Sequence, residues 1–361
     1  MLFATNTVKI GEKATMIIVM EHNATQKQLN RVIKYIEDRG MKSYIHKGDL
    51  LNVVAVIGDD INLNPENLAA LEGVSSVKKI QEPYKLASRV SHPEDTIITF
   101  PNGVKIGGLE RPVLMVGPCS VEKDFDGLLQ VATAAREMGC QFLRGGAFKP
   151  RTSPYDFQGL EEKGLEYLSK ASKKTGLLVV TEVMDTMDIQ LLCKYADVLQ
   201  VGARNMQNFK LLKALGRIKK PVMIKRGPAA TIKEFLLAAE YVISNGNPNV
   251  ILCERGVKSF DSQFSRNVLD IAAVPIIRKL SHLPIIVDPS HGTGKRYLIE
   301  PMGKAALVAG AHGLMFEVHH DPDNAMCDGA QSLNLEQFRE TTKALNKLIG
   351  RIDYDNKNSQ K

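Results

Sequence analysis

The sequence lacks tryptophan, and aromatic residues make up only 6% of its 361 positions. Proteins that bind single-stranded nucleic acid stack bases on aromatic side chains, so this chain offers little material for such a surface. It also has no run of five or more basic residues, and its formal net charge of +7 is spread along the chain. These absences argue against nucleic-acid binding. The excess of positive charge instead suits a pocket for small anionic molecules.

Long apolar segments are absent as well. Apolar runs such as 53–57 have the length of a strand, whereas a membrane-spanning helix needs about 20 apolar residues. The first residues do not show the charged segment followed by an apolar one that is typical of a secretory signal peptide. The five cysteines are widely spaced and form no C-x-x-C motif, which argues against a disulfide framework. We therefore expect a protein without membrane contact in a reducing cytoplasm.

Residues 14–82 predict a small fold of their own. Strand and helix signals follow one another in the order βαββαβ, with strands at 14–20, 42–46, 51–57 and 74–80 and helices at 26–39 and 65–71. This is the order of a ferredoxin-like domain. The segment contains no cluster of histidine, cysteine and carboxylate, so we expect no chemistry there. We assign residues 1–90 to this domain, 91–110 to an irregular connector and 351–361 to a polar tail.

Between residues 111 and 350 strands alternate strictly with helices. The eight strand candidates are 112–116, 141–143, 177–181, 198–201, 221–224, 250–253, 284–287 and 313–316. Eight such units predict an α/β fold, a (β/α)8 TIM barrel, which forms the catalytic domain at 111–350. The alternative is an open doubly wound sheet. That fold ordinarily carries a glycine-rich phosphate loop after its first strand, and Gly-Pro-Cys-Ser at 117–120 is not one.

A chemically capable side chain follows each of these eight strands. In strand order they are Cys119; Arg144 and Lys149; Glu182; Arg204; Lys225 and Arg226; Arg255; Asp288 and His291; and Glu317. In TIM barrels the catalytic groups project from the C-terminal ends of the strands and from the loops that follow. Strands also become polar where they reach solvent, but that explains one or two such residues better than a full set. We therefore expect an active site at this end of the barrel.

Most of these side chains are cationic. The set consists of Arg144, Lys149, Arg151, Arg204, Lys225, Arg226 and Arg255. The planar guanidinium of arginine donates paired hydrogen bonds to phosphate and carboxylate, and lysine supplies a compact charge. Any one of them alone is typical of a solvated surface. Together they predict one highly anionic substrate or two anionic substrates.

A second set combines a thiol, an imidazole and two carboxylates: Cys119, His291, Glu317 and Asp328. These donors suit a divalent transition metal, and the thiolate favours Fe, Co, Zn or a similar ion over Mg or Ca. His291 equally well predicts a catalytic base. His319 and His320 are competing ligand candidates, although they lie beyond the strand end.

Six motifs carry a resemblance to a known family. They are Gly-Pro-Cys-Ser at 117–120, Arg-Gly-Gly-Ala-Phe-Lys-Pro-Arg-Thr-Ser-Pro-Tyr at 144–155, Gln-Val-Gly-Ala-Arg-Asn at 200–205, Lys-Arg-Gly at 225–227, Cys-Glu-Arg-Gly at 253–256 and Asp-Pro-Ser-His at 288–291. In this order they resemble the 3-deoxy-D-arabino-heptulosonate 7-phosphate (DAHP) synthases over about residues 111–350. The chain looks like the type I-beta branch, in which a ferredoxin-like regulatory domain can precede the barrel.

The resemblance implies a metal-dependent condensation of phosphoenolpyruvate with D-erythrose 4-phosphate, the first step of the shikimate pathway to chorismate and the aromatic amino acids. Residues that match the family's phosphoenolpyruvate site are Arg144, Lys149, Arg204, Lys225 and Arg255, with Glu182 beside them. Residues that match its aldose phosphate site are Arg151, Thr152 and Ser153. The metal ligands match Cys119, His291, Glu317 and Asp328. The expected catalytic residues are Lys149, Glu182 and His291, with Lys149 as the proton donor to the new alkoxide.

The resemblance also implies an effector and an assembly. Tyrosine or phenylalanine is expected to bind the N-terminal domain, and the chain is expected to form a homo-oligomer, a tetramer. A rival within the same chemistry is 3-deoxy-manno-octulosonate 8-phosphate synthase, which uses arabinose 5-phosphate; Lys-Pro-Arg-Thr-Ser at 149–153 argues against it. Another is a catalytically inactive regulatory barrel, against which the complete polar set argues.

Overall fold

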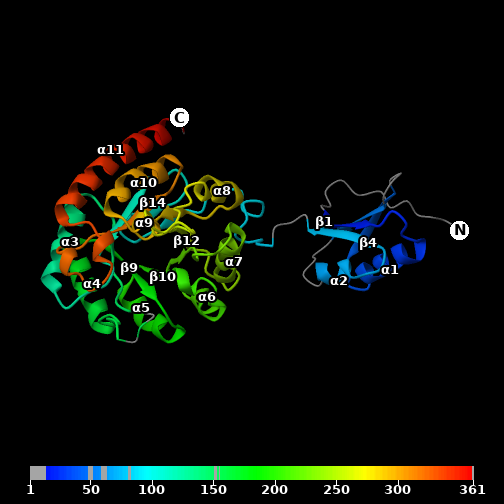
Figure 1. Ribbon diagram of the computed structural model, residues 1–361, viewed down its shortest axis with the longest axis horizontal. Helices are drawn as coiled ribbons and strands as arrows, with labels where there is room; N and C mark the ends of the chain where they lie inside the picture. The colour runs from blue at the N-terminus through cyan, green and yellow to red at the C-terminus, as the bar shows by residue number, and fades with distance from the viewer. Residues whose placement is uncertain are drawn as a thin grey trace. The chain divides into compact units, whose positions relative to one another are not determined.

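The chain folds into two compact units, Met1–Pro83 and Tyr84–Lys361. The computed structural model describes residues 14–47, 52–57, 63–79, 83–149, 153 and 155–359. Figure 1 shows a small sheet with helices in the first unit and a larger α/β barrel in the second. Each unit has a hydrophobic core of its own. The two are therefore described one at a time.

The first unit is a four-stranded antiparallel sheet in the order β2-β3-β1-β4. Its elements are β1 (Ala14–Met20), α1 (Gln26–Glu37), β2 (Lys42–Lys47), β3 (Asn52–Ile57), α2 (Pro65–Ala69) and β4 (Val74–Lys79). Every second residue of β1, namely Met16, Ile18 and Met20, is buried in one cluster with Leu29 and Val32 of α1. Strand alternation and helical spacing thus present matching apolar faces. The predicted ferredoxin-like fold is confirmed.

The second unit is a closed barrel of eight strands, each hydrogen-bonded in parallel to its neighbours. The strands are β7 (Val113–Gly117), β8 (Phe142–Arg144), β9 (Leu178–Val183), β10 (Val198–Val201), β11 (Val222–Lys225), β12 (Val250–Glu254), β13 (Ile285–Val287) and β14 (Gly313–Glu317). Each overlaps one of the predicted strands. The predicted TIM barrel is confirmed, and the open doubly wound sheet is excluded.

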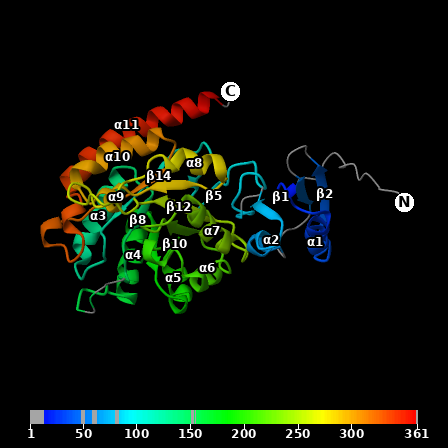
Figure 2. The same ribbon diagram turned by 45° about the vertical axis from the view of Figure 1, so that its right-hand side comes forward.

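Helices surround the strands, as Figures 1 and 2 show from two directions. They are α3 (Phe125–Glu137), α4 (Glu162–Thr175), α5 (Ile189–Tyr195), α6 (Phe209–Leu215), α7 (Ile232–Ile243), α8 (Ala273–Leu280), α9 (Pro289–Thr293), α10 (Arg296–Val308) and α11 (Leu335–Ser359). The predicted polar tail at 351–361 is thus helical as far as Ser359. Among the described helices, none combines the length and the apolar character that a membrane span requires.

The barrel interior is packed with side chains. Each strand contributes to one buried cluster: Met115, Phe142, Val180, Val198, Met223, Ile251, Ile286 and Met315. A short hairpin of β5 (Ile98–Thr99) and β6 (Lys105–Ile106) joins this cluster, and Phe100 meets the ring of Phe142 edge-on at 5.0 Å. Because Phe142 begins β8, the hairpin covers the N-terminal end of the barrel. The opposite, C-terminal end is the one at which TIM barrels carry their catalytic residues.

The segment before this hairpin belongs to the barrel unit. Tyr84 and Ala87 are buried in the core between strands and helices, and the backbone N–H groups of Leu86 and Ala87 donate to Glu240 at 2.9 and 2.8 Å. Arg89 donates to the carbonyl oxygen of Ser281 at 3.0 Å. The unit boundary after Pro83 therefore precedes residue 90, where the sequence suggests the end of the first domain.

Candidate active site

A cavity of about 310 Å³ opens where the barrel strands end. Eight of the residues singled out in the sequence line it: Arg144, Lys149, Glu182, Arg204, Lys225, Arg255, His291 and Asp328. They come from the ends of β8, β9 and β11, from the segments that follow β8, β10 and β12, from α9 and from the loop after β14. The parallel barrel brings them together because all its strands end on the same face.

Arg144 and Glu317 form a buried ion pair in the wall of this cavity. The Arg144 Nη1 atom donates to Glu317 Oε1 and to the carbonyl oxygen of Pro118, both at 2.8 Å. Burial lowers the pKa of Arg144, but the charges of Glu317 and Cys119 outweigh it and raise that pKa above its ordinary value. The guanidinium is therefore a permanent positive charge that is held in place before any ligand binds.

Lys149 lies next to Cys119 and contacts it through its ammonium group. Its Nζ atom donates to the Cys119 sulfur and carbonyl oxygen, both at 3.1 Å. Burial lowers the pKa of Lys149, but the thiol groups of Cys119 and Cys327 raise it overall. The pKa of Cys119 is well above its usual range because its thiol is hydrogen-bonded to the thiol of Cys327, because it is buried and because the negative charge of Glu317 is near. A metal cation would reverse that balance, since a coordinating thiol loses its proton.

The four predicted metal ligands lie together. One donor atom from each of Cys119, His291, Glu317 and Asp328 lies within 4.8 Å of all the others. The His291 Nε2 atom is 3.2 Å from Glu317 Oε1, and the Cys119 sulfur is 3.3 Å from Asp328 Oδ2. Asp328 adopts a left-handed backbone (φ +52°), an unfavourable conformation for a residue with a side chain. The spacing and the donor types fit a divalent transition metal.

Asp288 contacts a member of each of two sets: the four predicted metal ligands, called the four-residue group below, and the cations that line the cavity, called the cationic wall. Its Oδ2 atom accepts from Lys225 Nζ at 2.5 Å and lies 2.7 Å from His291 Nδ1. Burial opposes its charge, but His291 and Lys225 hold the pKa of Asp288 well below its usual range. Arg255 lies nearby, and burial lowers its pKa although the Asp288 charge partly offsets this. An anion that reaches Arg255 would therefore stabilise a charge that burial disfavours.

Glu182 supplies a carboxylate on the side of the cavity formed by β9 and β10. Its Oε2 atom accepts from Gln200 Nε2 at 3.1 Å. Gly202 makes room for it, because a Cβ atom at that position would lie 2.1 Å from Glu182 Oε1. In the sequence Gln-Val-Gly at 200–202, Gln200 thus orients the carboxylate with a hydrogen bond, and Gly202 leaves the space that the carboxylate occupies.

Several predicted residues lie elsewhere. Arg226 does not line the cavity: it pairs with Glu254 and Asp270, both at 2.8 Å. Placing Arg226 in the cationic mouth is therefore wrong. His319 and His320 lie outside the four-residue group and face Glu122 and Asp124 at 3.5 and 3.1 Å.

The proposed aldose phosphate loop is described only in part. Arg151 and Thr152 lie outside the described residues. Ser153 is described; its hydroxyl oxygen accepts from the backbone N–H of Tyr155 at 3.2 Å.

Four further residues lie in the cavity or contact residues next to it, and the strand-end pattern of the sequence does not predict them. Cys327 lies 2.9 Å from the Cys119 sulfur, Gln331 donates to Glu317 Oε2 at 2.6 Å, and Arg266 donates to Gln331 Oε1 at 3.0 Å. Lys258 lines the cavity as well. Adjacency to Asp328 was a usable signal for Cys327. Lys258 and Arg266 occupy the long loop after β12, which an inspection of strand ends does not reach.

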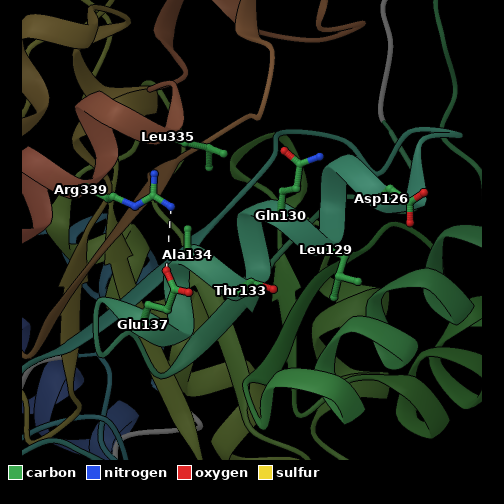
Figure 3. A pocket seen from close by; sticks show the side chains of 8 residues that line it. All are labelled: Asp126, Leu129, Gln130, Thr133, Ala134, Glu137, Leu335 and Arg339. Carbon is green, nitrogen blue, oxygen red and sulfur yellow. Dashed lines mark ion pairs between the residues drawn. The ribbon is translucent and has the colours of Figure 1, made fainter.

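A second hollow, of about 420 Å³, lies between α3 and α11 (Figure 3). Figure 3 shows Glu137 and Arg339 facing each other across it, with an ion-pair distance of 3.9 Å. None of the predicted catalytic, substrate-binding or metal-ligating residues lines it. The predicted site residues that line a cavity are thus those of the cavity at the strand ends.

A TIM barrel whose mouth combines buried cations with a thiol–imidazole–carboxylate group is an enzyme for small anionic substrates with a place for a metal. Comparison with known proteins is more specific. The DAHP synthetase I family matches residues 95–353, and the DAHP synthase ferredoxin-like domain matches residues 16–82. The chain belongs to the DAHP synthetase I family.

Individual relatives agree with this assignment. Phospho-2-dehydro-3-deoxyheptonate aldolase of Thermotoga maritima is 49% identical over 333 residues, which are 92% of this chain and 97% of that protein. The crystal structure of the Thermotoga DAHP synthase superposes with a TM-score of 0.88 at 47% identity, and covers 94% of this chain and 99% of that one. A 2-dehydro-3-deoxyphosphooctonate aldolase of Syntrophotalea carbinolica is 33% identical, over 67% of this chain and 92% of that protein.

The 2-dehydro-3-deoxyphosphooctonate aldolase is thus the more distant of these relatives. The predicted DAHP synthase function is confirmed. The chain is an enzyme, a transferase with DAHP synthase activity. It joins phosphoenolpyruvate to D-erythrose 4-phosphate at the entry to aromatic amino acid biosynthesis.

Proposed function

We propose that the cavity at the C-terminal end of the barrel carries out this condensation. The supporting observation is that the buried cations Arg144, Lys149 and Lys225 line one cavity, next to the group of four predicted metal ligands that includes Cys119. Two phosphates and a carboxylate must be held against their mutual repulsion, which fixed cations can do. An aldehyde also needs activation, which the neighbouring group can supply. Positioning and electrostatics are the main contributions of such a site.

Phosphoenolpyruvate is assigned to the cationic wall formed by Arg144, Lys149, Arg204, Lys225 and Arg255. Arg144 and Lys225 are oriented by Glu317 and Asp288, so they do not have to be ordered when the substrate binds. The aldose phosphate is assigned to Arg151, Thr152 and Ser153.

The metal is assigned to Cys119, His291, Glu317 and Asp328, with Mn, Fe, Co or Zn as the candidates. A thiolate ligand favours these over Mg or Ca. When bound, the metal supplies Lewis-acid polarisation of the aldehyde carbonyl. Glu317 also accepts a hydrogen bond from Arg144, so the proposed metal site and the proposed phosphoenolpyruvate site are in direct contact.

The reaction joins C3 of phosphoenolpyruvate to the aldehyde carbon. Lys149 Nζ is assigned as the donor that protonates the new alkoxide oxygen. Its position 3.1 Å from the sulfur of Cys119, an assigned metal ligand, supports this role, because the aldehyde is assigned to the metal. Positive charge at C2 is then captured by water, and Glu182 is assigned to accept the water proton. The resulting hemiketal releases inorganic phosphate and leaves the C2 ketone.

The N-terminal domain is assigned as the sensor of an aromatic end product, tyrosine or phenylalanine. It folds as a unit with its own core, and its described residues contain no cluster suited to a metal. A domain without chemistry beside the first enzyme of a pathway is well placed to report the level of the product. We also propose that the chain works as a homotetramer.

The test is a product assay with both aldoses. Protein stripped of metal by a chelator is supplied with Mn²⁺, phosphoenolpyruvate and either D-erythrose 4-phosphate or D-arabinose 5-phosphate. The amounts of phosphate and of sugar product formed are measured over time. We expect stoichiometric DAHP and phosphate with erythrose 4-phosphate and much slower turnover with arabinose 5-phosphate. Faster turnover of the pentose would favour the eight-carbon synthase, and no turnover of either would favour an inactive regulatory barrel.

A further inference from the structure

Three polar contacts converge on the buried carboxylate of Asp288. The residue follows β13 and caps the N-terminus of α9, where its Oδ1 atom accepts from the backbone N–H of His291 at 2.9 Å. Its Oδ2 atom lies 2.7 Å from His291 Nδ1 and 2.5 Å from Lys225 Nζ. Asp288 itself has no exposed surface. One carboxylate oxygen is thus shared by a proposed metal ligand and a proposed substrate-binding lysine.

This contact decides which imidazole nitrogen is free. An ionised carboxylate only accepts hydrogen bonds, so the neighbouring Nδ1 atom of His291 must carry the proton. The Nε2 atom is then unprotonated, and it is this atom that lies 3.2 Å from Glu317 Oε1 within the four-residue group. A metal-binding imidazole is commonly fixed in this way by a carboxylate behind it.

The carboxylate also separates two groups that would otherwise repel. Lys225 Nζ is 3.4 Å from His291 Nδ1, and both nitrogens carry hydrogen. Asp288 Oδ2 accepts from both and so holds them side by side. A lysine in this position without the carboxylate would favour the opposite tautomer of His291, which points its lone pair at the ammonium and away from the metal group.

We propose that Asp288 is a positioning residue that fixes the His291 imidazole for metal binding and, through the same oxygen, holds Lys225 ready for the anionic substrate. The inference rests on the proposed function, because that function assigns His291 and Lys225 to the two sites. It predicts that metal affinity depends on Asp288 itself and not on the buried ion pair that Asp288 forms with Lys225.

The experiment compares Mn²⁺ binding by the metal-stripped full chain and by three variants, with free Mn²⁺ measured by electron paramagnetic resonance. Asp288→Asn keeps the side-chain shape but can present an NH2 group to Nδ1, so both tautomers become available. We expect its Mn²⁺ Kd to rise about 10–100-fold, the usual cost of losing such a partner. Lys225→Met leaves Asp288 to His291 alone. We expect that variant to bind Mn²⁺ as tightly as the wild type while it loses phosphoenolpyruvate binding.

A third variant guards against loss of folding. Asp288→Asn alone leaves the Lys225 ammonium buried without its partner, which is strongly destabilising. The double variant Asp288→Asn/Lys225→Met removes both charges, so it should unfold at a higher temperature than Asp288→Asn and still bind Mn²⁺ as weakly. Nitrogen-15 NMR of the metal-free proteins should report the Nδ1–H tautomer of His291 in wild type and Lys225→Met, and a mixture of tautomers in the two variants that carry Asp288→Asn.

The outcomes separate the inference from the proposed function. If the wild type binds Mn²⁺ and condenses both substrates while Asp288→Asn binds Mn²⁺ equally well, the positioning role is overturned and the proposed function stands. The same holds if Lys225→Met weakens Mn²⁺ binding as much as Asp288→Asn does. If the wild type binds no Mn²⁺, the metal assignment fails, and the positioning role fails with it.

Discussion

The sulfur of Cys119 contacts Lys149, Cys327 and Asp328 within 3.3 Å, more polar partners than a structural core thiol needs. This crowding is the reason to assign it to a metal, since Lys149 and a bound metal ion would together stabilise a thiolate there. Cys140, by contrast, is buried in the core between strands and helices, and burial alone raises its pKa to about 12.

We predict that Cys119→Ser loses tight Mn²⁺ binding and most activity, because a neutral hydroxyl replaces a thiolate ligand. Cys193→Ser, at a half-buried position outside the cavity, is the matched control and should keep both. Metal analysis and steady-state assays measure the two effects. Full metal occupancy with normal turnover in Cys119→Ser would contradict the assignment.

Arg204 and Arg226 offer a contrast between binding and stability. Arg204 lines the cavity, so Arg204→Ala should raise the KM for phosphoenolpyruvate far more than the KM for erythrose 4-phosphate. Arg226 is tied to the buried Glu254, so Arg226→Ala should instead lower the free energy of unfolding by about 3–5 kcal/mol. Equal effects of Arg204→Ala on both KM values would show that the two anion sites are wrongly assigned.

Neighbouring residues also show what the sequence could and could not reveal. Lys225 lines the cavity and its neighbour Arg226 does not. At the end of the next strand, Arg255 lines the cavity and its neighbour Glu254 does not. Alternation along a strand could have separated each pair, because successive side chains point to opposite faces. Gln331 and Arg266 could not be found this way. Their contacts depend on the paths of two long loops, which no periodicity specifies.

The strands β13 and β14 are joined at their beginning by His312. Its Nδ1 atom accepts from the backbone N–H of Ile285 at 3.0 Å. Burial, with a smaller effect from the charge of Arg278, lowers the pKa of His312 from its ordinary value of 6.5 to about 4. The folded barrel therefore holds this imidazole neutral where the unfolded chain would protonate it.

This shift predicts a pH dependence of stability. Below pH 6.5 the unfolded chain takes up a proton at this position and the folded chain does not, so stability present above pH 6.5 is lost as the pH falls toward 4. His312→Gln should show a shallower loss across that interval, by at most about 1.4 kcal/mol per pH unit. Urea unfolding at a series of pH values measures it. Identical slopes for variant and wild type would contradict the prediction.

The segment that begins at Tyr84 is an integral part of the barrel rather than a free connector. Tyr84 is 2% exposed, and Arg89 forms an ion pair with Asp95 at 2.5 Å beside Ser281. The sequence could reveal the strands and helices of both units because their apolar periodicities are clear. It could not reveal this attachment, which depends on contacts with residues about 150 to 200 positions further along the chain.

We predict that a shortened chain starting at Tyr84 folds with the stability of the full barrel, whereas one starting at Ile98 is less stable. Loss of the buried Tyr84 ring alone should cost about 3–5 kcal/mol, as for other buried aromatic side chains. Thermal unfolding of the two chains, with Tyr84→Ala in the full chain as control, gives the comparison. Equal melting temperatures for both shortened chains would show that the segment contributes nothing.

The two units together define what regulation must achieve. An effector bound to the first unit can slow the barrel only if it binds two arrangements of the protein with different affinity. We predict that tyrosine or phenylalanine inhibits the full chain and that the chain from Tyr84 is active but insensitive. Initial rates with and without each amino acid test this. A full chain insensitive to all aromatic amino acids, or a shortened chain that is still inhibited, would contradict the sensor role.

The central claim is that one cavity joins a metal group and a cationic wall into a single condensing site. The most direct measurement is the rate of phosphate release by chelated full-length protein as Mn²⁺ is added, with phosphoenolpyruvate and erythrose 4-phosphate both present. We predict no release without metal, a rise to a plateau at one Mn²⁺ per chain, and no release when either substrate is omitted. Full activity in the chelated protein, or phosphate release from phosphoenolpyruvate alone, would contradict the account.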